Sequence, residues 1–324
     1  MSDTRQPRYH LGRLILNPLI LNFFIPTSFI LATLILFPCL TRAQDSQDDD
    51  VLRVNTDLVV LNVTVTDAQG NYVHGLKAAD FKIFEDGREQ PLNTITGFNV
   101  EETPFAAVLL LDTSGSMESR LTLARSAAIR FLGGLRDEDV AAIYRFDAKI
   151  ELVQEFSPGR DLPQMAYSIR AKGMTALNDA IRRAAIDLSG REEKRHAIVV
   201  LSDGMDNFSK ASANKALESA LAVGATIYTV DMSATEGNAS RDHQNAAVLR
   251  DFATKSGGRY VASAGGQALR DAFNGIVSEL GNQYTISYRP ANRARDGRWR
   301  TIDIKLSRPD LSARTRKGYR APKS

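Results

Sequence analysis

Short apolar runs alternate with segments of helical spacing through residues 103–282, and this alternation constrains the fold more than any other feature of the chain. The first run, residues 105–111, reads FAAVLLL and is followed by apolar residues spaced three and four apart. Uninterrupted apolar strands are buried on both faces, and strands that alternate with helices form parallel sheets. We therefore expect an α/β fold with a doubly wound, mostly parallel sheet. Strands are predicted at 105–111, 140–146, 150–153, 197–201, 226–230 and 260–261, and helices at 121–135, 176–188, 216–223, 246–254 and 268–280.

Segments with the period-two alternation of half-buried strands flank this region on both sides. A few strands at either end would be only marginally stable alone, and the ends of a compact domain usually lie close together. We therefore predict one smaller β-sandwich made jointly by residues 51–102 and 283–324, with residues 103–282 inserted between them. Its strands are expected at 54–66, 72–74, 81–85, 284–288, 302–306 and 313–316, with a hairpin turn at Asp86-Gly87.

Residues 14–40 form an apolar segment without a single charged side chain. Basic residues precede it, and Thr41-Arg42-Ala43 and an acidic spacer over residues 44–50 follow it. This order is typical of a secretory signal peptide, with cleavage expected after Ala43. An uncleaved membrane anchor is the alternative for residues 1–43, because about 20 apolar residues span a bilayer. Both interpretations place the remainder outside the cytoplasm, in the periplasm, the cell envelope or the extracellular space.

Charge and cysteine content exclude several classes of function. The 324 residues carry 41 basic and 38 acidic side chains, and a net charge of +3 offers no electrostatic footprint for nucleic acid. Cys39 is the only cysteine, so the chain cannot form an internal disulfide, and its four histidines lack the spacing of a zinc site. Residues 289–323 carry twelve Lys or Arg against three Asp. Such a stretch suits either an anionic envelope surface or solvent-facing strand positions.

Polar side chains follow two of the predicted strands at the point where each strand ends. Asp-Thr-Ser-Gly-Ser occupies residues 112–116, and Ser-Asp-Gly occupies residues 202–204. Ligands of doubly wound sheets bind at the carboxyl ends of strands, and a Gly-Met-Thr loop at 173–175 adds a further hydroxyl. Carboxylate and hydroxyl oxygens suit a hard cation such as Mg²⁺, Mn²⁺ or Ca²⁺. Taken singly, Asp112 and Ser114 could equally cap the next helix. Residues 202–204 could equally form a plain turn after a strand.

Together, Asp-x-Ser-x-Ser, Gly-x-Thr and Ser-Asp-Gly in this order resemble the von Willebrand factor type A (VWA) family. Residues 53–57 (RVNTD), 80–87 (DFKIFEDG) and 317–319 (KGY) are similar to an exported bacterial subgroup of VWA-related proteins. The resemblance implies an intact metal-ion-dependent adhesion site that holds a divalent cation, Mg²⁺ in preference to Mn²⁺ or Ca²⁺. It also implies a protein partner that offers an Asp or Glu side chain to the cation. The implied metal ligands are Asp112, Ser114, Ser116, Thr175 and Asp203, and the residues around them are Thr113, Gly173 and Asp206.

The expected function is that of an exported, metal-dependent, adhesion-type protein-binding module. The alternative is a structural subunit of a cell-envelope or surface assembly, in which the metal only stabilises the fold. Enzymatic activity is not expected, because the chain has no Gly-x-Ser-x-Gly nucleophile elbow and no phosphate-binding Gly-x-x-x-x-Gly-Lys-Ser/Thr loop. Asp206 either tunes the site or is a solvated loop carboxylate. The membrane is contacted only through an uncleaved N-terminal segment, and the oligomeric state is left open.

Overall fold

The structure is a computed structural model that describes residues 58–99, 103–164, 166, 170–233, 239–262 and 266–323. The chain divides into two compact units, Met1–Asp48 and Asp49–Ser324, and every described residue belongs to the second. The predicted signal peptide or anchor, the acidic spacer and the first positions of the strand expected at 54–66 lie outside the described residues. Within the described ranges, no helix combines the length and apolar character needed to cross a membrane.

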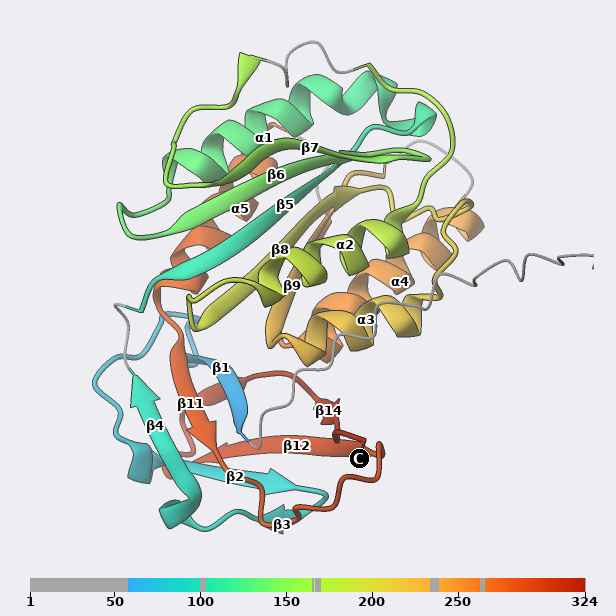
Figure 1. Ribbon diagram of the computed structural model, residues 1–324. Helices are drawn as coiled ribbons and strands as arrows, with labels where there is room; N and C mark the ends of the chain where they lie inside the picture. Colours follow the sequence, from blue (N-terminus) through green and yellow to red (C-terminus); the bar gives the residue numbers. More distant parts are fainter. Residues whose placement is uncertain are drawn as a thin grey trace, which may run out of the picture. The chain divides into compact units, whose positions relative to one another are not determined.

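A six-stranded sheet forms the centre of the predicted α/β region (Figure 1). Strand β7 runs antiparallel to β6, and all other neighbouring strands of this sheet are parallel. The mostly parallel sheet predicted from the apolar runs is therefore confirmed. In sheet order the strands are β10 (Tyr260–Ala262), β9 (Ala225–Asp231), β8 (Arg195–Ser202), β5 (Phe105–Asp112), β6 (Val140–Phe146) and β7 (Ile150–Ser157).

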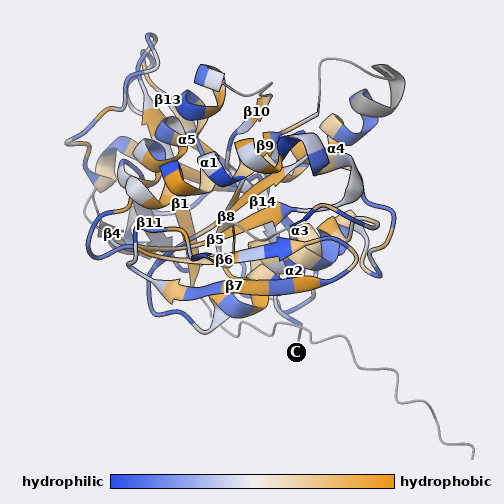
Figure 2. Ribbon diagram, turned by 90° about the horizontal axis from the view of Figure 1, so that it is seen from above, coloured by the Kyte–Doolittle hydropathy of each residue, from blue (hydrophilic) through white to orange (hydrophobic). Residues whose placement is uncertain are grey.

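Helices cover both faces of this sheet, because successive side chains of each buried strand point to opposite faces. Ala107 and Leu109 of β5 join the core beneath α1 and α5, whereas Ala106 and Val108 join the core beneath α2, α3 and α4. The strands at the centre of the sheet are coloured as hydrophobic in Figure 2. The helices are α1 (Leu121–Gly133), α2 (Leu177–Ser189), α3 (Ala213–Ala222), α4 (Ala239–Ser256) and α5 (Gly266–Gly281), and a 3-10 helix, η3 (Gly115–Arg120), leads into α1.

Two antiparallel four-stranded sheets combine the two flanks of the chain, as predicted. N-terminal strand β1 lies between C-terminal strands β11 and β13, and C-terminal strand β12 pairs with N-terminal strand β2. Leu61, Ile83, Ile286 and Ile304 belong to the core that the two sheets share. One sheet contains β13 (Ser312–Arg314), β1 (Val59–Thr66), β11 (Tyr284–Tyr288) and β4 (Ile95–Asn99); the other contains β14 (Gly318–Arg320), β12 (Trp299–Leu306), β2 (Phe81–Glu85) and β3 (Arg88–Glu89), and short 3-10 helices η1 (Ala78–Asp80) and η2 (Leu92–Thr94) precede β2 and β4.

The flanking segments contain one confirmed turn and one wrong strand prediction. Asp86 and Gly87 both have positive φ angles, 49° and 76°, and connect β2 to β3 as the sequence predicts. The strand predicted at 72–74 is absent, and Tyr72 makes only an isolated bridge to Thr66. The chain leaves the sheet there because the Tyr284 hydroxyl donates a hydrogen bond of 2.8 Å to the Val73 carbonyl, and because Gly75 turns the backbone with a φ of 75°.

Glu279 of α5 joins the α/β region to the sandwich. Its carboxylate is fully buried and pairs with Arg314 of β13 at 2.6 Å and with Arg259 at 3.1 Å. The Thr64 hydroxyl of β1 and the Tyr228 hydroxyl of β9 donate to Glu279 Oε1 at 3.2 and 3.0 Å. A single carboxylate therefore connects four elements that lie far apart in the sequence. A cavity of about 540 Å³ opens beside this network and is lined by Arg250, Arg259, Arg314 and Thr64 among others.

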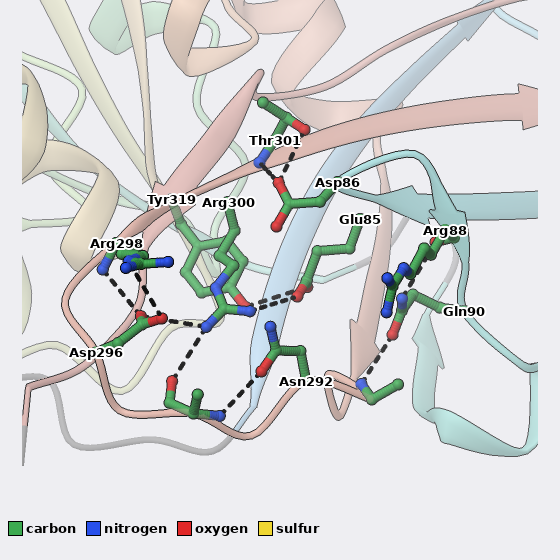
Figure 3. Close-up of polar contacts among 12 residues, drawn as sticks. Glu85, Asp86, Arg88, Gln90, Asn292, Asp296, Arg298, Arg300, Thr301 and Tyr319 are labelled. Carbon is green, nitrogen blue, oxygen red and sulfur yellow. Dashed lines mark hydrogen bonds and ion pairs between the residues drawn. The ribbon is translucent and has the colours of Figure 1, made fainter.

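A second buried ion cluster holds the sandwich together around Arg300 of β12 (Figure 3). Arg300 is 2% exposed and lies between Glu85 of β2, at 3.9 Å, and Asp296, at 3.2 Å. Burial raises the pKa of Glu85, while the hydroxyls of Tyr288 and Tyr319 donate to it and oppose that rise. Several arginines of the basic C-terminal stretch therefore form ion pairs within the chain. Carboxylates pair with Arg298, Arg300, Arg308, Arg314 and Arg320.

Candidate metal centre

Two adjacent parallel strands bring two carboxylates to the same edge of the sheet. Leu111 of β5 lies opposite Leu201 of β8, so the strands end side by side, with Asp112 as the last residue of β5 and Asp203 directly after the last residue of β8. Both side chains are buried. Ser202 links the two strand ends, because its hydroxyl donates to Asp112 Oδ2 at 2.6 Å and accepts the Gly204 N–H at 3.0 Å.

The Asp-x-Ser-x-Ser turn brings its two serine hydroxyls within hydrogen-bond distance of each other. The Ser114 N–H donates to Asp112 Oδ1 at 2.9 Å, which closes the turn, and Ser114 Oγ lies 3.2 Å from Ser116 Oγ. Ser114 occupies the N-cap position of η3 but makes no capping hydrogen bond with its side chain. The capping role that Ser114 suited on sequence alone is therefore absent, and its hydroxyl is directed at Ser116 instead.

The Gly-Met-Thr loop lies against this turn. Gly115 N–H donates to the Gly173 carbonyl at 3.2 Å, and Lys172 N–H donates to the Thr113 carbonyl at 2.9 Å. Gly173 has a φ of 77°, a backbone conformation that glycine adopts without strain. These contacts bring Thr175, which is buried, to the edge formed by β5 and β8. Within the described residues the Thr175 hydroxyl makes no hydrogen bond, and it remains available to a ligand.

Gly204 shapes the third loop, which carries Asp203. Its φ is 78°, and a Cβ there would lie 2.6 Å from the carbonyl oxygen of Asn245 in α4. Only glycine fits this position without a shift of the backbone. The turn is closed by the Met205 N–H, which donates to Asp203 Oδ1 at 3.1 Å. The loop therefore has a specific packing requirement beyond that of a plain turn.

The electrostatics of this edge favour a bound cation. Burial, helped by the nearby charge of Asp203 and opposed by the hydrogen bonds from Ser114 and Ser202, raises the pKa of the Asp112 carboxyl to about 6. In the described part of the chain neither Asp112 nor Asp203 forms an ion pair, and buried carboxylates are ordinarily paired or bound to a metal. Adjacent oxygens around Mg²⁺ lie about 3 Å apart, given bonds of about 2.0–2.1 Å, which matches the separation of the Ser114 and Ser116 hydroxyls.

The donor set therefore fits a hard divalent cation. It contains only two carboxylates, and among the described residues no three His, Cys, Asp or Glu side chains form a metal-binding group. A cation at this edge would depend on the hydroxyls of Ser114, Ser116 and Thr175 for its remaining protein oxygens. Such an all-oxygen set suits Mg²⁺, Mn²⁺ or Ca²⁺ rather than zinc or copper.

Asp206 supports the site through the backbone and is not a plain solvated carboxylate. Its Oδ2 accepts the Asn178 N–H at 2.8 Å, and its Oδ1 accepts the Ser209 N–H at 3.1 Å. It thereby ties the loop after β8 to the start of α2. Thr113, also expected near the site, is buried and donates both its N–H and its hydroxyl to the Phe146 carbonyl, at 2.7 and 3.1 Å.

Three supporting residues were missing from the predicted site. Ser202 stands within the Ser-Asp-Gly motif, and its position before the aspartate is the signal that identifies it. Asn207 Oδ1 accepts the Thr175 N–H at 2.8 Å, and Asp179 accepts the N–H groups of Lys210 and Ala211 at 2.9 and 3.0 Å. These last contacts join residues about thirty positions apart, so no local spacing in the sequence points to them.

Part of the α/β region matches a known protein family. Residues 107–205 match the family model described as the von Willebrand factor type A domain, and all five predicted ligands lie inside that match. No curated protein matches the chain.

Solved structures with a related arrangement include an aerotolerance-related membrane protein from Bacteroides fragilis, with 20% identity over 54% of this chain and 99% of that one and a TM-score of 0.45. The PilB minor pilin from Streptococcus sanguinis has 16% identity over 60% and 63% of the two chains and a TM-score of 0.44. A von Willebrand factor type A protein from Catenulispora acidiphila has 14% identity over 76% and 74% and a TM-score of 0.46. The family match therefore identifies residues 107–205 as a region of von Willebrand factor type A sequence.

Proposed function

We propose that this protein is a metal-dependent protein-binding module that engages a carboxylate of its partner through a divalent cation. The observation that carries the proposal is the pair of buried carboxylates, Asp112 and Asp203, at adjacent strand ends without an ion pair among the described residues. When bound, the cation would neutralise these carboxylates and supply a site for an oxygen of the partner.

The proposed ligands make two kinds of contribution to cation binding. Asp112 and Asp203 supply negative charge, and Ser114, Ser116 and Thr175 supply neutral oxygens. Mg²⁺ takes six oxygen ligands, and five protein oxygens leave one position for an external donor. Ser202 orients Asp112 through its 2.6 Å hydrogen bond, and Asn207 orients the Thr175 loop through its 2.8 Å hydrogen bond. The proposed activity is binding without turnover.

A metal titration tests this proposal on the purified full chain. Isothermal titration with Mn²⁺ is expected to show one site, and Ser116→Ala or Thr175→Ala should weaken it at least tenfold. Ser119→Ala is the matched control, because Ser119 is an exposed serine of the same 3-10 helix. Equal Mn²⁺ affinity in Ser116→Ala, Thr175→Ala and Ser119→Ala would contradict the proposed ligand set.

A structural subunit remains the second candidate function, favoured by the complete burial of Asp112. A cation there would stabilise the fold whether or not a partner binds. An array of immobilised peptides, each with one central Asp and varied neighbours, separates the two functions. The binding module is expected to be retained in Mn²⁺ and released by EDTA. If Mn²⁺ raises the melting temperature but no Asp peptide is retained, the metal only stabilises the fold.

We further propose that the protein acts outside the cytoplasm, on the support of the apolar segment 14–40. A C-terminal alkaline phosphatase fusion in a bacterial host is expected to be active. An inactive fusion at normal abundance would contradict export. Mass spectrometry of the product separates the two forms of the N-terminus, because cleavage after Ala43 leaves Gln44 as the first residue.

A further inference from the structure

Two large apolar side chains are exposed beside the candidate metal centre. Met174 is 45% exposed and Phe208 is 47% exposed, and the large hydrophobic residues with comparable exposure in the described ranges are Ile129, Leu152 and Trp299. Single exposed hydrophobics are common on protein surfaces, whereas neighbouring ones often mark a site of interaction. Met174 directly precedes Thr175, and the Phe208 N–H donates to the Thr175 carbonyl at 3.0 Å. Both side chains therefore emerge from backbone that contacts the same proposed metal ligand.

The backbone that carries these two side chains is held on several sides. The N–H of Thr175 donates to Asn207 Oδ1 at 2.8 Å, and the Asn207 N–H returns to the Thr175 carbonyl at 3.1 Å. Asp206 Oδ1 accepts the N–H of Ser209, the residue directly after Phe208, and the Gly173 carbonyl accepts the Gly115 N–H. A partner that covers Met174 and Phe208 would meet a pre-ordered surface, so little ordering entropy would oppose binding.

The charge beside this surface selects the chemistry of the occupant. Lys172 is exposed two residues before Met174, while both oxygens of Asp206 accept backbone N–H groups. A cation at the metal centre would add positive charge next to the two apolar side chains. An acidic group flanked by an apolar group matches this arrangement of charge and hydrophobic surface.

We infer that Met174 and Phe208 select a partner segment in which the Asp or Glu that reaches the cation stands next to a large aliphatic or aromatic residue. This inference rests on the proposed function, because it concerns the residues around the same carboxylate. Covering a large apolar side chain stabilises a complex in proportion to the apolar area removed from water. Met174 and Phe208 are each about half exposed in the free protein, so a preference of about tenfold or more for an apolar neighbour is expected.

The Asp-peptide array in Mn²⁺ tests this inference with the residue beside Asp as the variable. The wild-type chain is expected to retain peptides with Leu, Met or Phe beside Asp about tenfold more strongly than peptides with Ser there. The double variant Met174→Ser/Phe208→Ser should lose that preference. The matched control is Ile129→Ser/Leu152→Ser, which removes two similarly exposed hydrophobics from α1 and β7 and should keep the preference.

Mn²⁺ titration of both double variants separates the surface from the metal site. The inference is supported if Met174→Ser/Phe208→Ser binds Mn²⁺ with wild-type affinity but retains peptides equally well whichever residue stands beside Asp. Retention that depends on Mn²⁺ but shows no preference in the wild-type chain overturns the inference and leaves the proposed function standing. A preference that survives in Met174→Ser/Phe208→Ser overturns it as well. Absence of Mn²⁺-dependent retention on every Asp peptide overturns both the inference and the proposed function.

Discussion

The hydroxyl of Ser202 donates a 2.6 Å hydrogen bond to Oδ2 of Asp112, and so joins the ends of β8 and β5 at the candidate metal centre. The same oxygen of Ser202 accepts the Gly204 N–H at 3.0 Å. One serine therefore sets both the orientation of a buried carboxylate and the start of the loop that carries Asp203.

Ser202→Ala should destabilise the fold and weaken the metal site together. It leaves a buried carboxylate oxygen and a buried N–H without their partner, which costs about 1–3 kcal/mol for each such group. Urea unfolding is expected to show a loss of about 2 kcal/mol or more, and Mn²⁺ titration should show a weaker site. Ser119→Ala is the control and should change neither quantity. A Ser202→Ala protein as stable as the control would mean that the bond to Asp112 contributes nothing.

Gly204→Ala should be more damaging than the same change at another glycine with positive φ. A Cβ at Gly204 would lie 2.6 Å from the Asn245 carbonyl, so backbone strain of about 1–2 kcal/mol is joined by a steric clash. Gly224 has a φ of 69° and no atom within 4 Å of an added Cβ, so Gly224→Ala carries the strain alone. Unfolding free energies of the two variants measure the difference. If the two variants lose the same unfolding free energy, α4 shifts to accommodate the added Cβ without a loss of stability.

Glu279→Gln should cost far more stability than a similar change at an exposed ion pair. The substitution leaves Arg314 and Arg259 without their buried carboxylate, and a broken buried pair typically costs about 3–5 kcal/mol. Glu218 pairs with Arg320 near the surface, so Glu218→Gln is expected to cost about 0–1 kcal/mol. Chemical denaturation of both variants tests this. A loss in Glu279→Gln no larger than in Glu218→Gln would contradict a connecting role for Glu279.

Acidification should destabilise the protein partly through His196. Burial lowers the pKa of its imidazole below the ordinary value of about 6.5, while the bond between Nδ1 and the Val223 carbonyl, 2.8 Å long, opposes that shift. The unfolded chain then takes up a proton at a higher pH than the folded chain does. Stability conferred by the neutral ring is complete above about pH 6.5 and is lost as pH falls below that value.

The variant His196→Asn keeps a donor for Val223 and removes the titration. Its unfolding free energy should fall less between pH 7.5 and pH 5 than that of the wild-type chain. If both proteins lose the same amount over that interval, His196 does not contribute to the pH dependence.

The sheet, and the strand ends at which Asp112 and Asp203 lie, could be predicted from the sequence because both depend on where the apolar runs end. The run over 105–111 stops at Asp112 and the run over 197–201 stops at Ser202, so the strand ends could be placed within a residue. The union of the two flanks followed from the same logic, since neither set of strands could be stable alone. Helix α4 was expected only from residue 246, because its first turns, from Ala239, are polar and show no apolar face.

Features that depend on distant partners were not accessible from local pattern. Strand β4 contains Gly97, whose backbone lies close to Ser287 of β11, and β14 is a three-residue edge strand. The pairing of β4 with β11 involves residues far along the chain, and β14 pairs with β12 through only three residues. The support that Asp206 gives to α2 has the same origin, because an aspartate that accepts one backbone N–H 28 residues away resembles any loop aspartate in the sequence.

We propose that one divalent cation is surrounded by the oxygens of Asp112, Asp203, Ser114, Ser116 and Thr175. An anomalous difference map from crystals grown with Mn²⁺, collected near the manganese edge, would locate that cation. A peak is expected at the carboxyl ends of β5 and β8, within about 2.0–2.6 Å of oxygens from this set. A map with full Mn²⁺ peaks elsewhere, and none between Asp112 and Thr175, would contradict it.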